Sequence, residues 1–420
     1  MTHILIIPSE EFIPPESHLA GIFQLHQAQA LIEAGFKVGV LSIKQVYSVP
    51  MLLKGVVSRL LKTSSNPLLP PGSWKELLLL LYRKLFYPSE FIVFDNINGV
   101  FVVRAEGIYD FKPMESLNHM AWSRAGHAAF NAYSEAYGTP DVLHAHNALN
   151  GGLLAASLSR KFDLPYVITE HSSFVARGLV SRSLYGKIAA CYRKSSSLLV
   201  VSPFLGKCLE GEIGIAHSDW DWVPNVLDPD WLRQPLQKDI PKEPLQIIAI
   251  GNLISVKDHA TVIRAFAKLP KNFEIQLVIA GDGPDENELK RIVSELTIDD
   301  QVIFTGRLTR QALIQQIDRS CCVVLPSLFE TFGVVLIESL MRGVPVVSSR
   351  CGGPECIVNQ QNGVLVEPQN VAELRDALIN VISNLDRYDA ENLRKSAILN
   401  FGPQRLVADL NEIYAKALSR

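Results

Sequence analysis

Residues 326–349 read PSLFETFGVVLIESLMRGVPVVSS, and this stretch decides the predicted fold. An apolar strand that ends at Pro326 is followed by a helical pattern that stops at Arg342. Gly343 is typical of a helix C-terminal cap, and Pro345 cannot continue a helix. A strand followed directly by a helix is the repeating unit of a parallel α/β sheet.

Two glutamates interrupt this apolar stretch. We expect Glu330 at the carboxyl end of the strand, immediately before a helix that begins near Thr331 or Phe332, with Glu338 in the second helical turn. The helix N-terminus should favour an anion there, and a glycine at 333 lets a phosphate approach the backbone. The amides expected to point outward are those of Phe332, Gly333 and Val334. As an alternative, Glu330 is a solvated loop acid and Glu338 pairs with Arg342 one turn later.

The same alternation of apolar strands and helices runs through most of the chain. The strands are predicted at 3–8, 37–43, 141–146, 165–170, 197–202, 247–251, 275–283, 302–306, 321–326, 344–349 and 363–367. Strands that are apolar at consecutive positions indicate parallel sheets covered on both faces, so we predict two α/β domains in tandem. The predicted parts are a first domain at 1–227, a proline-rich linker at 228–244, a second domain at 245–400, and a C-terminal helix at 401–420 that packs back on the first domain.

Residues 44–125 break the pattern and are predicted to be an insertion in the first domain. Asn98-Gly99 between two apolar runs indicates a β-hairpin. Residues 44–84 contain seven basic residues and one acidic residue, and MLLKGVVSRLLK (51–62) and WKELLLLLYRKLF (74–86) are basic, apolar and partly aromatic. That combination favours an anionic membrane surface. The alternative is two helices packed on the first domain with solvated lysines.

The composition fits a soluble globular protein of 420 residues with a net charge of −3. No basic excess is available to neutralise nucleic-acid phosphates, so we expect no nucleic-acid partner. The six cysteines form no CxxC pairs and are expected to be reduced. The N-terminus lacks a signal-peptide pattern and no apolar run is long enough to span a membrane, so a cytoplasmic location is expected.

Several short motifs occur in a characteristic order along the chain. They are Thr169-Glu170-His171, Val223-Pro224-Asn225, Gly251-x-Leu253 with Lys257, Ala280-Gly281-Asp282-Gly283-Pro284, Phe304-Thr305-Gly306, Glu330-x7-Glu338, and Gly343-x-Pro345-Val346-Val347. Together they resemble the retaining nucleotide-sugar glycosyltransferases of family 4. The resemblance covers nearly the whole chain apart from 44–125. It implies the GT-B fold, in which two Rossmann-like domains face each other across a cleft.

The resemblance assigns roles to the two glutamates and their surroundings. Glu338 would accept hydrogen bonds from the ribose hydroxyls of the donor nucleotide, which suits a carboxylate facing a vicinal diol. Glu330 would lie beside the donor sugar, as would His171. Backbone amides near Phe332 and Gly333 would touch the sugar or the diphosphate.

A cationic site for the diphosphate is predicted after the strand at 247–251. Lys257 lies near a loop-to-helix junction, where a cation can stabilise a departing diphosphate. The family usually has Arg directly after Gly251, whereas this chain has Asn252, which supplies no charge. Arg307 is a conjectured substitute.

The acceptor side is predicted to include His146 and Gly21. His144 and His146 are expected to point to opposite faces of their strand, with His146 nearer the strand end. The predicted activity is transfer of a hexose-type sugar from a nucleoside diphosphate sugar to a glycan or lipid-linked acceptor, with no metal and no other cofactor. A sugar-nucleotide epimerase and a catalytically silent sugar-nucleotide-binding protein are the alternatives.

Overall fold

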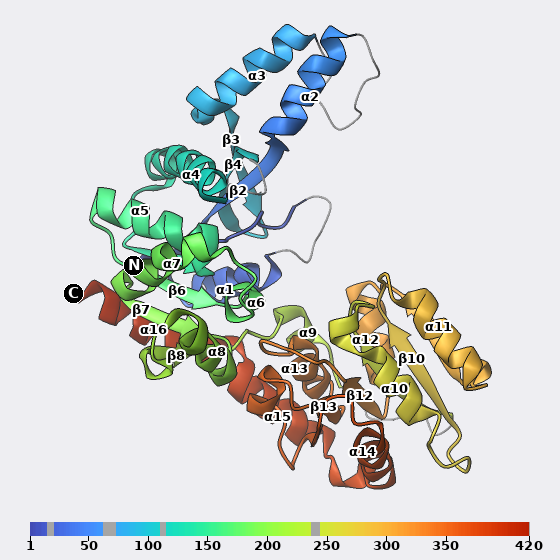
Figure 1. Ribbon diagram of the computed structural model, residues 1–420. Helices are drawn as coiled ribbons and strands as arrows, with labels where there is room; N and C mark the ends of the chain where they lie inside the picture. The colour runs from blue at the N-terminus through green and yellow to red at the C-terminus, as the bar shows by residue number, and fades with distance from the viewer. Residues whose placement is uncertain (15–20, 62–72, 110–114, 237–243, 420) are drawn as a thin grey trace. The chain divides into compact units, whose positions relative to one another are not determined.

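The computed structural model describes residues 1–14, 21–61, 73–109, 115–236 and 244–419. The chain divides into two compact units (Figure 1). Unit 1 contains residues 1–200, 206–223 and 407–420, and unit 2 contains residues 201–205 and 224–406. Each unit has its own sheet with helices packed around it, so the predicted pair of parallel α/β domains is confirmed.

Unit 1 is built on an eight-stranded sheet with the order β3-β4-β2-β1-β5-β6-β7-β8. Every pairing is parallel except that of β3 with β4. The central strands are buried at every position, as expected of a parallel sheet covered on both faces. The strands are β1 (His3–Ile7), β2 (Lys37–Ser48), β3 (Ile92–Ile97), β4 (Val100–Tyr109), β5 (Val142–His146), β6 (Tyr166–Glu170), β7 (Ser197–Val200) and β8 (Trp220–Trp222).

Helices from both ends of the chain surround this sheet. They are α1 (Ile22–Glu33), α2 (Val49–Leu60), α3 (Trp74–Phe86), α4 (Glu115–Tyr137), α5 (Leu153–Phe162), α6 (Ser173–Ala176), α7 (Arg182–Lys194), α8 (Pro203–Ile213) and α16 (Pro403–Leu418). In α16, the hydroxyl of Tyr414 lies 2.6 Å from Nδ1 of His144 on β5. The end of the chain is thereby fastened to the sheet of unit 1.

The segment 44–125 adds to the sheet of unit 1. The predicted hairpin is confirmed: β3 and β4 pair antiparallel, and Asn98 and Gly99 form the turn with φ angles of 51° and 87°. Strand β4 also pairs in parallel with β2 and so extends the main sheet. Helices α2 and α3 pack on each other through a small apolar cluster of Leu52, Val56 and Leu77.

Unit 2 is built on a six-stranded parallel sheet with the order β11-β10-β9-β12-β13-β14. The chain first moves outward from β9 to β11 and then returns to the other side of β9 with β12. The order therefore reverses between β9 and β12, and ligands of such sheets bind outside the carboxyl ends of the strands at this switch point. The strands are β9 (Leu245–Ile250), β10 (Ile275–Ala280), β11 (Val302–Gly306), β12 (Cys322–Leu325), β13 (Val346–Ser349) and β14 (Gly363–Val366).

The helices of unit 2 include one inside the stretch predicted as the linker, 228–244. Asp228 caps α9 (Pro229–Arg233), and Trp231 is almost completely buried, so this part packs into unit 2 and the change of unit falls earlier, at Val223 and Pro224. Residues 237–243 lie outside the described residues. The remaining helices are α10 (His259–Phe266), α11 (Glu286–Glu295), α12 (Arg310–Asp318), α13 (Val334–Met341), α14 (Val371–Ser383) and α15 (Ala390–Phe401).

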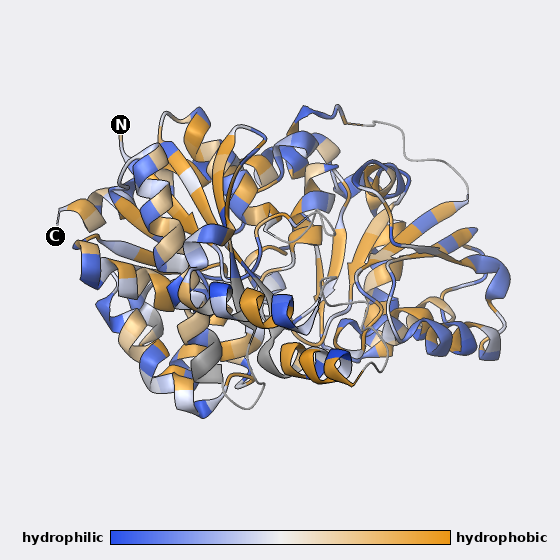
Figure 2. Ribbon diagram, turned by 90° about the horizontal axis from the view of Figure 1, so that it is seen from above, coloured by the Kyte–Doolittle hydropathy of each residue, from blue (hydrophilic) through white to orange (hydrophobic). Residues whose placement is uncertain are grey.

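Apolar residues are concentrated in the strands of both sheets, as the colouring of Figure 2 shows. The helices carry both polar and apolar residues, as expected of helices that cover a sheet. Within the described parts of the chain, no helix combines the length and the apolar character needed to cross a membrane.

Candidate active site

Lys257 and Glu330 meet at the switch point of the sheet in unit 2. Lys257 lies in the loop after β9, and Glu330 lies in the loop after the neighbouring strand β12. The ammonium of Lys257 donates to Oε1 of Glu330, which also accepts from the hydroxyl of Ser327 at 2.7 Å. The two side chains are 24% and 12% exposed, so the pair is held mostly within the protein while part of it faces solvent.

Main-chain hydrogen bonds hold the two loops together. The amide of Leu328 donates to the carbonyl of Val256 at 2.8 Å, which ties the β12 loop to the β9 loop. Glu330 also bridges to the loop after β13, because its carbonyl accepts from the amide of Gly353 at 2.8 Å. The backbone at Glu330 is thus held from both sides, and Lys257 and Ser327 hold its carboxylate.

Helix α13 begins later than predicted. The sequence predicted a start near Thr331 or Phe332, whereas the first helical residue is Val334. The reason is that Gly333 adopts a left-handed conformation with φ 102°, which cannot be part of a right-handed α-helix. The side chain of Phe332 is buried and packs edge-on against Phe401, so only the backbone of Phe332 can serve a ligand.

Glu338 lies in the second turn of α13, as predicted. Burial and the nearby carboxylate of Asp228 raise the pKa of Glu338 to about 8, and the guanidinium of Arg310 opposes this shift. The alternative pairing of Glu338 with Arg342 is not found: Arg342 binds Asp318, with 2.6 Å between Nε and Oδ1. The pKa of Glu338 is therefore raised, and Arg342 forms no ion pair with Glu338 that would lower it.

Asp228 and Arg310 were missed by sequence reasoning as neighbours of Glu338. Nη1 of Arg310 lies 2.6 Å from Asp228 and 3.0 Å from Asp230, so one guanidinium binds both acids. Asp228 was assigned to a linker, although an acid before Pro229 is also a helix N-cap signal. No sequence signal identified Arg310, because its role depends on the tertiary packing of α12 near α9.

The other predicted donor residues lie at the same carboxyl edge of the sheet. Gly251 and Asn252 follow β9, and the side chain of Asn252 is exposed. Arg307 follows β11 and donates to Asp282 at 3.2 Å. Strand β10 lies between β11 and β9, and Asp282 belongs to the loop after β10, so the cation of Arg307 is partly neutralised beside that strand.

His146 and His171 come together in unit 1. Nδ1 of His146 lies 2.8 Å from Nε2 of His171, and His171 follows the carboxyl end of β6. The rings of His144 and His146 also stack, with 4.8 Å between their centroids. The prediction that His144 and His146 point to opposite faces is therefore wrong, because residues two apart in a strand share a face. Burial and the neighbouring imidazoles lower the pKa of His146, which keeps this histidine neutral.

Helix α1 contributes to the same part of unit 1. Gly21 precedes α1 in a left-handed conformation with φ 79°, and the ring of Phe23 stacks on His171 with 6.5 Å between centroids. The predicted acceptor-side residues Gly21 and His146 thus both lie near the end of β6.

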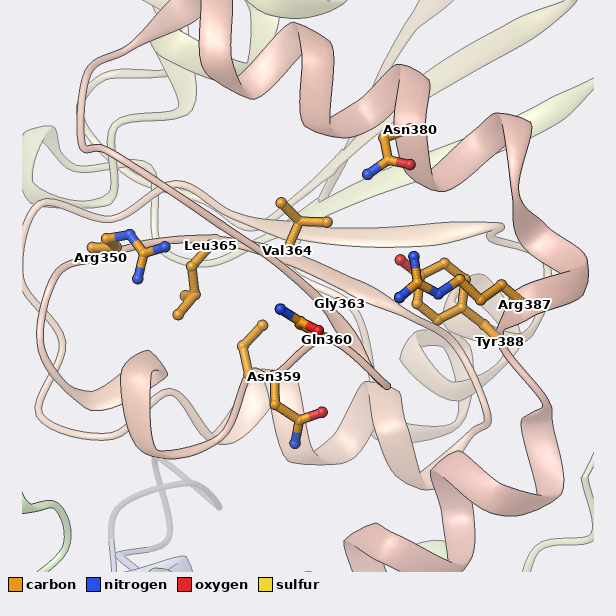
Figure 3. Close-up of a pocket in the computed structure, with 10 residues that line it drawn as sticks. Arg350, Asn359, Gln360, Gly363, Val364, Leu365, Asn380, Arg387 and Tyr388 are labelled. Carbon is orange, nitrogen blue, oxygen red and sulfur yellow. The ribbon is translucent and has the colours of Figure 1, made fainter.

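A separate cavity of about 470 Å³ lies beside the edge strand β14 of unit 2 (Figure 3). Its lining includes Arg350, Asn359 and Arg387, and none of the predicted donor residues. Among the residues that the structure describes, no group of three His, Cys, Asp or Glu side chains could hold a metal ion. The six cysteines are unpaired.

Comparison with known proteins matches two long segments of the chain to families of sugar-transferring enzymes. Residues 233–398 match the family described as glycosyl transferases group 1, and residues 95–231 match glycosyltransferase family 4. N-acetyl-alpha-D-glucosaminyl L-malate synthase of Bacillus anthracis is 32% identical over 289 residues, which are 66% of this chain and 75% of the relative. Glycogen synthase of Mycobacterium tuberculosis is 29% identical over 282 residues, 63% of this chain and 67% of the relative.

Solved structures show the same fold. Sucrose-phosphate synthase from Thermosynechococcus elongatus superposes with a TM-score of 0.72 at 19% identity and covers 100% of both chains. HepE of Anabaena, solved in complex with UDP, has a TM-score of 0.67 at 16% identity, over 99% of this chain and 100% of the other. The chain is a glycosyltransferase with the GT-B fold. It belongs to the family 4 type of these enzymes.

Proposed function

We propose that this glycosyltransferase moves a hexose-type sugar from a nucleoside diphosphate sugar to an acceptor hydroxyl, with retention of the anomeric configuration. Unit 2 binds the donor and unit 1 binds the acceptor. The observation that carries the proposal is the meeting of Lys257 and Glu330 at the switch point of unit 2, where sheets of this order bind ligands. HepE, which shares the fold, was solved with UDP-glucose, and this supports a nucleotide-sugar donor.

Each part of the donor has a matching group in unit 2. The diphosphate lies where the ammonium of Lys257 and the amides at the start of α13 supply positive charge. The sugar lies beside Glu330. The ribose diol donates to Glu338, whose carboxylate accepts two hydrogen bonds when ionised.

The transfer proceeds on one face of the sugar and needs no covalent enzyme intermediate. The acceptor oxygen forms a bond to the anomeric carbon on the face from which the diphosphate departs, as the bond between that carbon and the diphosphate oxygen breaks. The proton of the acceptor hydroxyl passes to the departing phosphate. Lys257 stabilises the negative charge that develops on that phosphate, and no metal is required.

In this proposal His171 forms hydrogen bonds to sugar hydroxyls, and the buried His146 orients it through the contact between Nδ1 of His146 and Nε2 of His171. A neutral imidazole both donates and accepts, which suits hydroxyl groups. The lowered pKa of His146 keeps it in that neutral form at pH 7. General-base catalysis by His146 is disfavoured for the same reason.

The packed helix pair of α2 and α3, here called the α2–α3 hairpin, supports a lipid-linked acceptor. The enzyme would then work at the cytoplasmic face of a membrane, in cell-surface polysaccharide or glycolipid assembly. Large apolar side chains of the hairpin are exposed, among them Leu79, Tyr82 and Phe86, at 54%, 49% and 54%. Lys54 and Lys75 are exposed on the same two helices. Apolar and basic groups on one element suit an anionic membrane surface. Lys62 lies outside the described residues.

The experiment that tests the proposal is a screen of nucleoside diphosphate sugars by thermal shift, followed by proton NMR of the product. A bound donor raises the unfolding temperature by mass action. We expect a product with the anomeric configuration of the donor. An inverted product would refute retention, and an epimerised nucleotide sugar formed without acceptor would favour the epimerase.

A further inference from the structure

Unit 1 contains a large basic pocket that the proposed reaction does not use. The pocket is bounded by α4, α5 and α7 and has a volume of about 1070 Å³. It reaches Tyr166 at the amino end of β6, whereas His171 follows the carboxyl end of that strand. The pocket is therefore at the other end of the sheet from the predicted acceptor residues.

The lining of this pocket is strongly cationic. It contains five basic side chains and one acid, Asp163, although the whole chain has a net charge of −3. Within the described residues, none of the five cations lies at ion-pairing distance from a carboxylate. The five are Arg124, Arg160, Lys161, Lys187 and Lys194.

Helix dipoles account for only part of this arrangement. Arg160 and Lys161 lie in the last turn of α5 and Lys194 in the last turn of α7, where a cation offsets the negative helix end. Arg124 and Lys187 lie in the interior of α4 and α7, where the helix dipole does not stabilise a cation. Their gathering around one cavity is better explained by a ligand of opposite charge.

Two histidines, His119 and His127, line the pocket beside these cations. Burial and Lys187 lower the pKa of His119 to about 4, and burial, Lys161 and Arg160 lower the pKa of His127. Nδ1 of each ring is buried and has no hydrogen-bond partner in the described part of the protein. Both residues line the pocket, and in each ring one nitrogen keeps unused hydrogen-bonding capacity.

The rest of the lining suits a ligand with a less polar part. Ser123 and Ser159 add hydroxyls, while Met120 and Leu153 add apolar surface. Arg124 also contacts Phe86, the last residue of α3, with its guanidinium 5.7 Å from the ring centroid. One lining residue of the pocket, Arg124, therefore also contacts the end of α3.

We propose that the pocket bounded by α4, α5 and α7 binds a phosphate-bearing ligand with at least two negative charges, separate from the sugar donor. Arginine and lysine together with hydroxyl donors are the groups that recognise phosphate. The phosphate belongs either to a free metabolite or to a lipid headgroup. Both sources share the chemistry, and the contact of Arg124 with the hairpin makes the second accessible from a membrane.

The test uses inorganic pyrophosphate as the probe and calorimetric titration of the full chain. The variant Lys187→Glu/Lys194→Glu reverses two charges of the pocket. The matched control, Arg182→Glu/Arg193→Glu, makes the same change in net charge on exposed positions of the same helix that do not line the pocket. Because the donor site can also take a diphosphate, all titrations are repeated in the Lys257→Ala background.

We expect the pocket variant to bind pyrophosphate at least about 10-fold more weakly than the control, which corresponds to the loss of charge-assisted contacts. Equal affinities of the two variants would overturn the proposal. If the pocket variant does not fold, NMR of the wild-type histidines decides: the His119 and His127 signals should shift and saturate with pyrophosphate, and unshifted signals at saturation would overturn it.

Vesicles separate the two sources of phosphate. The variants are sedimented with phosphatidylcholine vesicles that contain or lack anionic phosphatidylglycerol. A lipid headgroup as ligand predicts that the pocket variant loses binding to the anionic vesicles while the control retains it. A free metabolite predicts that both variants sediment alike and differ only in pyrophosphate affinity.

Discussion

The ammonium of Lys257 is bound by the carboxylate of Glu330, 73 residues further along the chain. The strands β9 and β12 that precede them are neighbours only because the strand order of the sheet reverses between them. Because Glu330 holds the ammonium of Lys257 in place, this cation does not have to move when a diphosphate binds. Such a preorganised cation is effective at stabilising the negative charge that develops on the departing diphosphate. The same pairing also prevents Lys257 from being an unmatched charge in the free enzyme.

Replacing Glu338 should weaken donor binding. We expect Glu338→Ala to cost about 1.5–3 kcal/mol, the usual worth of hydrogen bonds to a charged group. The measurement is a calorimetric titration with the donor found in the thermal-shift screen, made at pH 9, where Glu338 is ionised. Glu286→Ala, an exposed acid paired with Lys290, is the control. Equal donor affinity in Glu338→Ala and in the control would remove Glu338 from the donor site.

The raised pKa of Glu338 should make the free protein less stable in alkali. The folded state holds a proton that the unfolded state releases near pH 4.5, so this contribution to stability is full below that pH and is lost as the pH rises through about 8. Glu338→Gln cannot ionise. At pH 9 the free energy of unfolding of Glu338→Gln should exceed that of the wild type by about 1–2 kcal/mol. The difference is smaller than the full pKa shift implies, because the side chain of Glu338 keeps some contact with solvent.

The comparison of Glu338→Gln with the wild type at pH 4.5 is the control for this prediction. Both carry a neutral group there, so the difference in unfolding free energy should be near zero. A stability difference that stays constant from pH 4.5 to pH 9 would show that the carboxyl of Glu338 is not perturbed by Asp228 and burial.

Buried histidines should make the protein sensitive to acid. Burial, with a smaller effect of His171, lowers the pKa of His144 to about 3. Below pH 6.5 the unfolded state therefore binds a proton at this histidine, whereas the folded state does not. Stability is full above that pH and should fall by about 1.4 kcal/mol for each pH unit below it. His144→Gln should show a shallower loss of unfolding temperature between pH 6.5 and pH 5. Parallel curves for the two proteins would contradict the neutral state of His144.

The α2–α3 hairpin should bind anionic vesicles. Purified protein is expected to sediment with them at low salt and to be released as salt rises, since screening shortens the attraction. Leu79→Asp/Phe86→Ser should abolish sedimentation, because it places polar groups on the exposed apolar face. The control Leu399→Asp changes an exposed leucine of unit 2. Absence of sedimentation of the wild type at low salt would leave a soluble acceptor as the better proposal.

The parallel sheets could be predicted because each strand and helix is encoded by a local pattern of apolar residues. The start of α13 was missed because it depends on the left-handed conformation of Gly333, which composition alone does not specify. The contact of Lys257 with Glu330 and that of Arg310 with Asp228 could not be predicted, since they arise from strand order and helix packing. The stacking of His144 on His146 was within reach, because strand periodicity alone requires it.

Release of nucleoside diphosphate from the donor sugar, in the presence of acceptor, tests the central claim most directly. We predict that Lys257→Ala lowers turnover at least about 100-fold, because the charge that stabilises the departing diphosphate is lost. Lys290→Ala, which removes an exposed cation from α11, should leave turnover unchanged. Arg307→Ala should reduce turnover only if Arg307 replaces the charge absent at Asn252. Equal turnover of Lys257→Ala and the wild type would contradict the assignment of the diphosphate to the switch point of unit 2.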